Sequence, residues 1–149
     1  MPAQAKLVEK PSLTIKRCLN AAPEKVYAAW TDPEKILKWF GPDSGPVHEA
    51  TTDVRVGGRY AVSFSTEDGE EHNVSGVYRE VVPNRKLVFT WAWRTLPPER
   101  ESLVTILIKP DGAGSILTLI HEQFFDEAAR DGHRKGWTGT LDKLERYLA

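Results

Sequence analysis

The residues DGHRKGWTGTLDKLERYLA, positions 131–149, have the spacing of an amphipathic helix with one buried side. Apolar side chains recur there every three or four residues, and this spacing predicts a helix over about 126–148. His133 lies one helical turn before Trp137, the first residue of the apolar stripe. The apolar stripe consists of Trp137, Leu141, Leu144 and Leu148. The chain is therefore expected to end in one long helix that packs against an apolar surface.

Three glycines lie inside this helix, although each costs about 0.5–1 kcal/mol of helix stability relative to alanine. Gly132, Gly136 and Gly139 follow one another at spacings of four and three residues, so they share one side of the helix, beside the apolar stripe. Three interpretations stay open. The glycines allow a neighbouring backbone to approach closely, they leave space for a cavity, or they lie on a solvent-facing side.

In most segments that precede this helix, apolar residues recur every second residue and not every 3.6 residues, which is typical of strands. Turn residues such as Asp68-Gly69 and Pro110-Asp111-Gly112 separate neighbouring segments. Short connections of this kind join antiparallel strands. A first strand is expected over about 12–20, and six more over 46–54, 58–66, 71–82, 86–94, 102–109 and 115–124.

Two short helices are expected between the first and second strands. Pro23 suits a first helical position, and apolar residues follow it at helical spacing. In the second helix Asp32 is the expected N-cap ahead of Pro33, and Gly41-Pro42 ends the helix. The sequence therefore predicts an α+β fold. Its seven-stranded, curved antiparallel sheet wraps around the long C-terminal helix, with two short helices after the first strand.

Length, charge and cysteine content restrict the class of protein. The 149 residues fit one domain, expected over 12–149 after a flexible N-terminal arm over 1–11. The net charge of −1 argues against a nucleic-acid partner, and no apolar run is long enough for membrane insertion. The single cysteine, Cys18, excludes an internal disulfide. Since no secretory signal is visible, we expect a cytoplasmic location.

The sequence contains no motif for metal or cofactor chemistry. No two of the four histidines have the His-x-x-x-His spacing, and a Cys-x-x-Cys pair is absent. Gly57-Gly58 lacks the pattern of a phosphate-binding loop, and the Gly-x-Ser-x-Gly motif of serine hydrolases does not occur. We therefore expect no metal site and no cofactor.

Alternation along four strands assigns a set of apolar and aromatic residues to the concave side of the sheet, facing the last helix. This set either fills a core completely or lines a ligand-sized cavity between the sheet and the helix. In the second case the lining is expected to consist of Tyr60, Val62, Phe64, Leu87, Phe89, Trp91, Val104, Ile106, Leu117, Leu119, His121, His133, Gly136, Trp137 and Leu141.

Two histidines of this set are candidate catalytic residues. His121 ends an inward-facing strand register, and His133 shares the apolar side of the last helix, so both are expected at one apolar space. An imidazole there could orient a ligand or transfer a proton near neutral pH. The alternative is one hydrogen-bonded histidine in the core and one at the rim. Arg17 also faces inward, and a structural ion pair is expected for it, with Glu80 and Glu122 as candidate partners.

Five segments together carry a family resemblance. They are AAPEKVYAAWTDPEKILKWFGP (21–42), DVRVGGRY (53–60), GVYREVVPNRKLVFTW (76–91), LTLIHE (117–122) and HRKGWTGTLDKL (133–144). With them the chain, over about residues 13–148, resembles the START/SRPBCC superfamily and, within it, the family of the activator of the heat-shock chaperone ATPase. The resemblance implies a helix-grip fold with a cavity between the final helix and the sheet.

The resemblance leaves three functions open, because that superfamily includes ligand carriers, cyclase-like enzymes and co-chaperone domains. The leading interpretation is a small soluble module that binds an apolar or aromatic small molecule without a reaction. The second is a cyclase- or hydrolase-like enzyme that uses His121 or His133 as a general base. The third is a co-chaperone-type interaction domain with a chaperone partner. Ligand identity and oligomeric state are not predicted.

Overall fold

The structure of the protein, a computed structural model, describes residues 10–149. Its elements follow the predicted order, with one unpredicted 3₁₀ turn, η1. They are β1 (Leu13–Leu19), α1 (Pro23–Thr31), α2 (Pro33–Trp39), β2 (Val47–Thr52), β3 (Arg59–Ser65), β4 (Glu71–Val82), β5 (Lys86–Trp93), η1 (Pro98–Arg100), β6 (Ser102–Asp111), β7 (Gly114–Glu122) and α3 (Glu127–Tyr147). The expected N-terminal arm, 1–11, lies outside the described residues apart from its last two.

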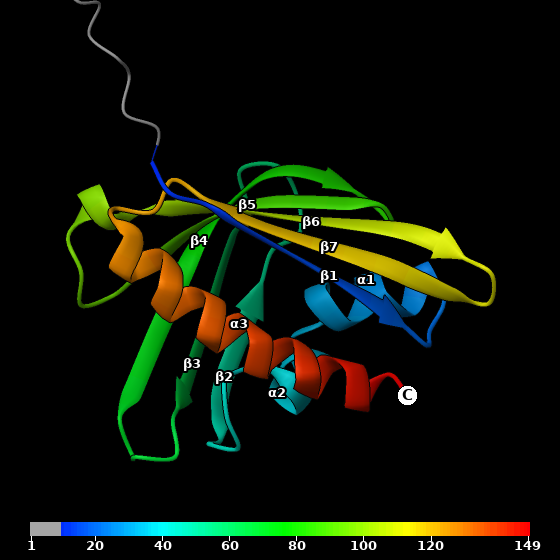
Figure 1. Cartoon of the computed structure of the whole chain (residues 1–149), viewed down its shortest axis with the longest axis horizontal. Coiled ribbons are helices and arrows are strands. Elements are labelled where there is room, and N and C mark those ends of the chain that lie inside the picture. The colour runs from blue at the N-terminus through cyan, green and yellow to red at the C-terminus, as the bar shows by residue number, and fades with distance from the viewer. Residues whose placement is uncertain (1–9) are drawn as a thin grey trace, which may run out of the picture.

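Seven antiparallel strands form one curved sheet in the order β1-β7-β6-β5-β4-β3-β2 (Figure 1). From β2 to β7 each strand pairs with the next one in sequence, as the short turns require. β1 pairs with β7, so that Leu13 lies opposite His121 and Leu19 opposite Ser115. The predicted α+β class, with a seven-stranded sheet and a C-terminal helix, is confirmed.

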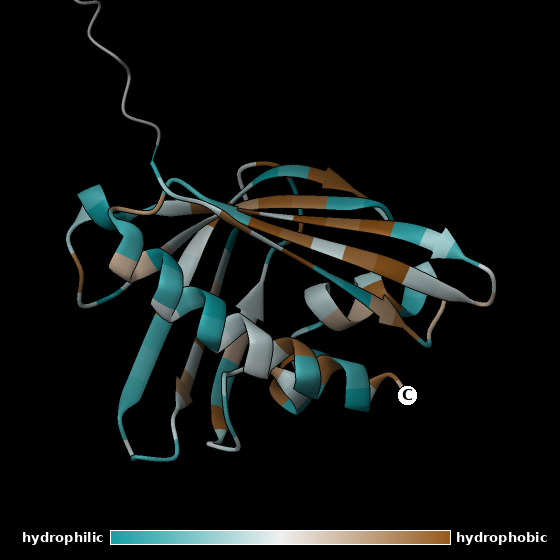
Figure 2. Ribbon diagram, viewed as in Figure 1, coloured by the Kyte–Doolittle hydropathy of each residue, from teal (hydrophilic) through white to brown (hydrophobic). Residues whose placement is uncertain are grey.

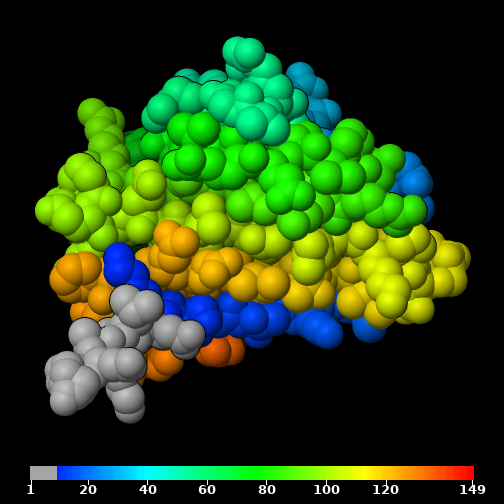
Figure 3. Space-filling view, turned by 90° about the horizontal axis from the view of Figure 1, so that it is seen from above, coloured from blue at the N-terminus to red at the C-terminus, as the bar shows by residue number. Residues whose placement is uncertain are grey.

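The three helices lie on the concave face of the sheet (Figure 1). Because β1 and β2 form opposite edges of the sheet, the chain between them has to cross this face, and it does so as α1 and α2. Figure 3 shows the opposite face, where β1, β7, β6, β5 and β4 lie side by side without a covering helix. Figure 2 shows that the middle parts of β6 and β7 are apolar, whereas much of α3 is hydrophilic. The apolar core therefore lies between the sheet and the helices.

Local sequence signals set the helix ends. α1 and α2 start with Pro23 and Pro33, whose fixed backbone angle suits the first helical position. The Asp32 side chain accepts a hydrogen bond from the Glu34 N–H at 3.0 Å and caps α2. At the start of α3, Asp126 accepts in the same way from Ala129 at 2.8 Å. The predicted cap at Asp32 is therefore present, and Asp126 provides a second cap of the same kind.

The C-terminal half of α3 packs tightly against the sheet. Leu141 and Leu144 have no exposed surface. An ion pair fixes the same half to the sheet edge, because Arg17 Nη1 of β1 lies 2.7 Å from Asp142 Oδ1 of α3. The expectation of Glu80 or Glu122 as the partner was wrong, since the helix, and not a strand, supplies the nearest carboxylate. None of the described helices is long and apolar enough to span a membrane.

Candidate functional site

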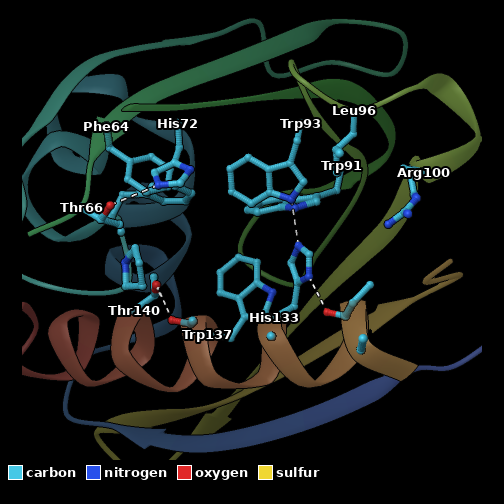
Figure 4. Close-up of a pocket in the computed structure, with 17 residues that line it drawn as sticks. Phe64, Thr66, His72, Trp91, Trp93, Leu96, Arg100, His133, Trp137 and Thr140 are labelled. Atoms are coloured by element: carbon cyan, nitrogen blue, oxygen red, sulfur yellow. Dashed lines mark hydrogen bonds between the residues drawn. The ribbon is translucent and has the colours of Figure 1, made fainter. Parts of the chain in front are cut away.

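A cavity of about 420 Å³ lies between the N-terminal half of α3 and the sheet (Figure 4). Its volume falls in the usual range for small-molecule sites. Strand residues Phe64, His72, Trp91 and Trp93 form one wall, and α3 forms the other with Ala128, Ala129, Gly132, His133, Gly136, Trp137 and Thr140. Connecting segments complete the lining with Phe40, Gly41, Pro42, Thr66, Leu96 and Arg100.

The walls of this cavity are mainly aromatic. Trp91 and Trp93 are two residues apart on β5 and therefore share a face, with perpendicular rings whose centroids are 5.4 Å apart. Trp137 of α3 packs 5.0 Å from Trp91, and Phe64 of β3 packs 6.2 Å from Trp93. These spacings are typical of attractive aromatic pairs. The cavity thus offers rigid, apolar ring surfaces from both the sheet and the helix.

The three glycines of α3 have different surroundings, which answers the question that their spacing raised. A Cβ atom built on Gly132 would meet no atom within 4 Å, and one on Gly136 would meet only the Pro42 Cβ, at 3.8 Å. Both glycines line the cavity. A Cβ on Gly139 would instead collide with the carbonyl oxygen of Pro42. Two glycines therefore leave cavity volume, and the third lets the segment after α2 approach the helix backbone.

His133 connects the two walls of the cavity. The Trp93 indole Nε1–H donates a hydrogen bond to His133 Nε2 at 2.9 Å, and His133 Nδ1 lies 2.7 Å from the Ala129 carbonyl oxygen (Figure 4). An indole can only donate and a carbonyl can only accept, so Nδ1 carries the proton and Nε2 is unprotonated. The neutral imidazole thereby fixes the orientation of the Trp93 ring.

His121 has the same role for Trp137, deeper in the protein. Its side chain is completely buried, and Trp137 Nε1–H donates to His121 Nδ1 at 2.9 Å. His121 Nε2 lies 2.7 Å from Ser102 Oγ. Since Nδ1 accepts from the indole, the proton of the neutral ring is on Nε2, which donates to the serine. This chain of hydrogen bonds connects α3, β7 and β6.

The electrostatic surroundings keep both imidazoles neutral. Burial lowers the pKa of His121 well below its usual range, and the nearby His133, whose ring centroid is 5.0 Å away, lowers it further. Burial also lowers the pKa of His133, although its hydrogen bond to the Ala129 carbonyl acts in the opposite direction. A general base needs a nitrogen lone pair that faces the ligand. In this arrangement both available lone pairs accept from tryptophans instead.

The expected cavity set divides into three groups. Those that line the cavity are Phe64, Trp91, His133, Gly136 and Trp137. Tyr60, Val62 and Phe89 lie with Trp91 around a second hollow of about 30 Å³, which has room for about one water. The remaining members are completely buried and line neither hollow; they are Leu87, Val104, Ile106, Leu117, Leu119, His121 and Leu141. They belong to the filled core of buried residues, where α1 packs on β6 and β7 and where His121 contacts Phe124 and Trp137.

Part of the lining was missed. Trp93 has the strand parity of Trp91, which assigns it to the concave face, but the expected lining did not include it. Thr140 lies one helical turn after Gly136, so spacing alone could have identified it. Leu96 and Arg100 lie in the connection between β5 and β6, where no periodic signal exists. Pro42 was interpreted as a helix stop alone. The paths of the connecting segments bring Leu96, Arg100 and Pro42 to the cavity, and alternation does not predict these paths.

Two buried indole N–H groups, those of Trp30 and Trp91, have no acceptor among the described residues. A buried donor without an acceptor costs about 1–3 kcal/mol. Because Trp91 lines the cavity, a ligand or a water there could bring the missing acceptor. Residues 10–149 contain no group of three His, Cys, Asp or Glu side chains placed to bind a metal ion.

Known proteins resemble this chain over nearly its full length. The model of the family "Activator of Hsp90 ATPase homolog 1-like protein" matches residues 20–149. Among solved structures, protein CV1439 from Chromobacterium violaceum is 29% identical, with a TM-score of 0.82, and the match covers 92% of this chain and 96% of that one. The AHSA1 protein from Silicibacter pomeroyi is 29% identical, with a TM-score of 0.79 and coverage of 93% and 97%.

A more distant match is CalU16 from Micromonospora echinospora, which is 26% identical with a TM-score of 0.68. This match covers 93% of this chain and 76% of that one. No functionally curated protein matches the chain. The comparisons therefore give the family and the fold, and any assignment of a ligand depends on the cavity itself.

Proposed function

The chain belongs to the family of Activator of Hsp90 ATPase homolog 1-like proteins, and we propose that it is a small module that binds an apolar or aromatic small molecule. The ligand lies between the N-terminal half of α3 and the tryptophans of β5. The observation that carries the proposal is the aromatic cavity of about 420 Å³ beside two helix glycines. Burial of apolar ligand surface contributes about 25 cal/mol per Å².

Preorganisation of the cavity supports this proposal. The indole rings of Trp93 and Trp137 are held by hydrogen bonds of 2.9 Å to His133 and His121, so ligand binding does not have to order them. Binding to side chains that are already fixed avoids a cost of about 0.5–1.5 kcal/mol for each side chain. The two histidines therefore act as positioning residues for the walls of the site.

We further propose that residues 12–149 form a single domain that works in the cytoplasm, as the lone Cys18 favours.

A blocked cavity tests the proposal. N-phenyl-1-naphthylamine, a neutral aromatic probe, is titrated into the wild-type protein and the variants Gly132→Leu and Gly136→Leu. Both glycines line the cavity with free space around a built Cβ, so each leucine should fill ligand volume and weaken binding about tenfold or more while the fold is kept. Lys135→Leu is the matched control, because it places the same side chain on an exposed position of α3. Unchanged affinity in both folded glycine variants would refute the proposed site.

A chaperone interaction is the second candidate, because the description of the family names an activator of Hsp90 ATPase. Its test is the ATPase rate of Hsp90 with and without the protein. A higher rate with the protein, unchanged by Gly136→Leu, would support an interaction surface that does not depend on the cavity. An unchanged rate would oppose this candidate.

Catalysis by His121 or His133 stays a prediction. It would require a ligand to replace a tryptophan as the hydrogen-bond partner of an imidazole. If an activity is found, replacement of both histidines by glutamine should reduce it by about 10²–10⁴-fold, the usual contribution of a general base. Full activity of a folded double variant would exclude the proton-transfer role.

A further inference from the structure

The charge of the cavity lining is uneven. Among the described residues, Arg100 is the only Lys, Arg, Asp or Glu side chain that lines it. Aromatic and aliphatic groups dominate the rest of the wall. In Figure 4, Arg100 lies at one end of the cavity and Thr66 with His72 at the other, with Trp91 and Trp93 between them. A ligand inside the cavity would therefore meet one fixed positive charge and no negative one.

Most polar groups of the lining are already paired within the protein. Trp93 donates to His133, and His133 pairs with the Ala129 carbonyl. Thr140 Oγ1 donates to the Gly136 carbonyl at 2.8 Å. Thr66 Oγ1 donates to Asp68 Oδ1 at 2.6 Å and lies 3.2 Å from His72 Nε2. The donors of Arg100 therefore stand out among the polar groups of the wall, since most of the others would have to break an internal hydrogen bond to meet a ligand.

The Arg100 guanidinium is held in place without being neutralised. Its Cζ atom lies 3.9 Å from the centroid of the Phe125 ring, a stacking arrangement that leaves the N–H edges of the guanidinium free. Within residues 10–149 it forms no ion pair and no hydrogen bond, although Glu99 and Glu101 are its neighbours in sequence. Arg100 is partly buried at the C-terminal end of η1. It is thus a positioned cation with unused donors at the end of an aromatic cavity.

We propose that the ligand of this cavity is an aromatic anion, whose rings lie among Trp91, Trp93 and Trp137 and whose carboxylate or similar oxyanion pairs with Arg100. The planar guanidinium matches an oxyanion with two parallel hydrogen bonds, and such charge-assisted bonds are stronger than neutral ones. This inference rests on the proposed function and adds the chemical class of the ligand to it. Arg100 selects an acidic ligand, and the tryptophans bind its rings.

The test compares two probes that differ mainly by one anionic group. 1-Anilinonaphthalene-8-sulfonate carries a sulfonate on the ring system of the neutral N-phenyl-1-naphthylamine. Both are titrated into the wild-type protein, Arg100→Gln and Arg94→Gln by calorimetry. Arg94→Gln is the matched control, because it removes the same charge at an exposed position just after β5 that does not line the cavity. Circular dichroism checks that each variant is folded.

The wild-type protein should bind the sulfonate about tenfold more tightly than the neutral probe at low salt. Arg100→Gln should abolish this preference, because it weakens binding of the sulfonate far more than binding of the neutral probe, whereas Arg94→Gln should keep the preference. In the wild-type protein the preference should also decrease as ionic strength rises from about 0.05 M to about 0.5 M, a readout that needs no variant. Equal binding of the two probes, or a preference that survives Arg100→Gln, overturns the inference alone. Binding of neither probe overturns the proposed function as well.

Discussion

His121 and His133 make the stability of the protein sensitive to acid. The folded-state pKa of each is lowered, first of all by burial, below the value of about 6.5 for an unfolded histidine. As the pH falls below about 6.5, the unfolded chain takes up protons that the folded protein does not, so the free energy of unfolding decreases. Above that pH both states are neutral and the full contribution is present.

His133→Gln should reduce this acid sensitivity. It removes one of the two titrating groups, while the amide oxygen of glutamine can still accept the hydrogen bond from Trp93. One histidine contributes a slope of at most about 1.4 kcal/mol per pH unit to the free energy of unfolding. Urea unfolding between about pH 7.5 and pH 5.5 should therefore give a shallower loss of stability in the variant than in the wild-type protein. Parallel curves would contradict the neutral state assigned to His133.

Two glycines of α3 should respond in opposite directions to the same substitution. Gly132→Ala should raise the free energy of unfolding by about 0.5–1 kcal/mol, because helix propensity improves and the added methyl group meets no atom. Gly139→Ala should lower it by about 1–3 kcal/mol, because the methyl group would collide with the Pro42 carbonyl. Chemical denaturation of the two variants measures both values. Stabilisation by both changes would mean that the close approach at Gly139 is wrong.

At the scale of elements, Lys143 fixes the segment after α2 to α3. Its ammonium donates to the carbonyl oxygens of Phe40 and Asp43 at 2.9 Å and 2.7 Å. Burial lowers the pKa of Lys143, and the neighbouring Asp43 acts in the opposite direction. The residues between these carbonyls, Gly41 and Pro42, line the cavity. One lysine on the helix therefore shapes one end of the site.

Lys143→Met should loosen this segment. The substitution keeps an aliphatic side chain but leaves two carbonyl oxygens without their donor, at a cost of about 1–3 kcal/mol in the free energy of unfolding. Affinity for the neutral naphthylamine probe should fall in parallel, since Gly41 and Pro42 line the cavity. Lys135→Met, at an exposed position of the same helix, is the control and should change neither quantity. Wild-type stability and affinity in Lys143→Met would show that the segment does not depend on the lysine.

Most elements of the fold could be predicted, because their signals are local. Period-2 alternation placed the strands, Asp32 caps α2 as the sequence indicated, and α3 starts next to the predicted position 126. Contacts between residues that are distant in sequence could not be predicted in this way. The pairing of β1 with β7 and the ion pair between Arg17 and Asp142 join residues that are 96 to 125 positions apart. No local sequence pattern predicts such pairs, because they form only when the chain crosses the sheet.

The extent of the cavity was less predictable than the face of the sheet that it occupies. Parity correctly placed Leu117 and Leu119 inside the protein, but it could not show that they lie in the filled part of the core. That outcome depends on where α1 lies and on how α3 runs over the sheet. The cavity lies beside the N-terminal half of α3, where Gly132 and Gly136 have no side chain to fill it.

At the scale of the whole molecule, the filled core and the cavity lie against the same sheet. A single curved sheet and its three helices enclose a core that is filled at one end and open at the other, and we propose that the open end binds an aromatic ligand. The five tryptophans report directly on this division. Trp91, Trp93 and Trp137 line the cavity, whereas Trp30 and Trp39 line only the smaller hollow of about 30 Å³, which Trp91 also borders.

The most direct test follows the five indole N–H signals in a two-dimensional ¹H–¹⁵N NMR spectrum during titration with N-phenyl-1-naphthylamine. Each signal is assigned by a single Trp→Phe substitution. Our prediction is that the signals of Trp91, Trp93 and Trp137 shift together with the added probe, with much smaller changes at Trp30 and Trp39. Saturable binding that shifts Trp30 and Trp39 and leaves the other three signals unchanged would contradict it.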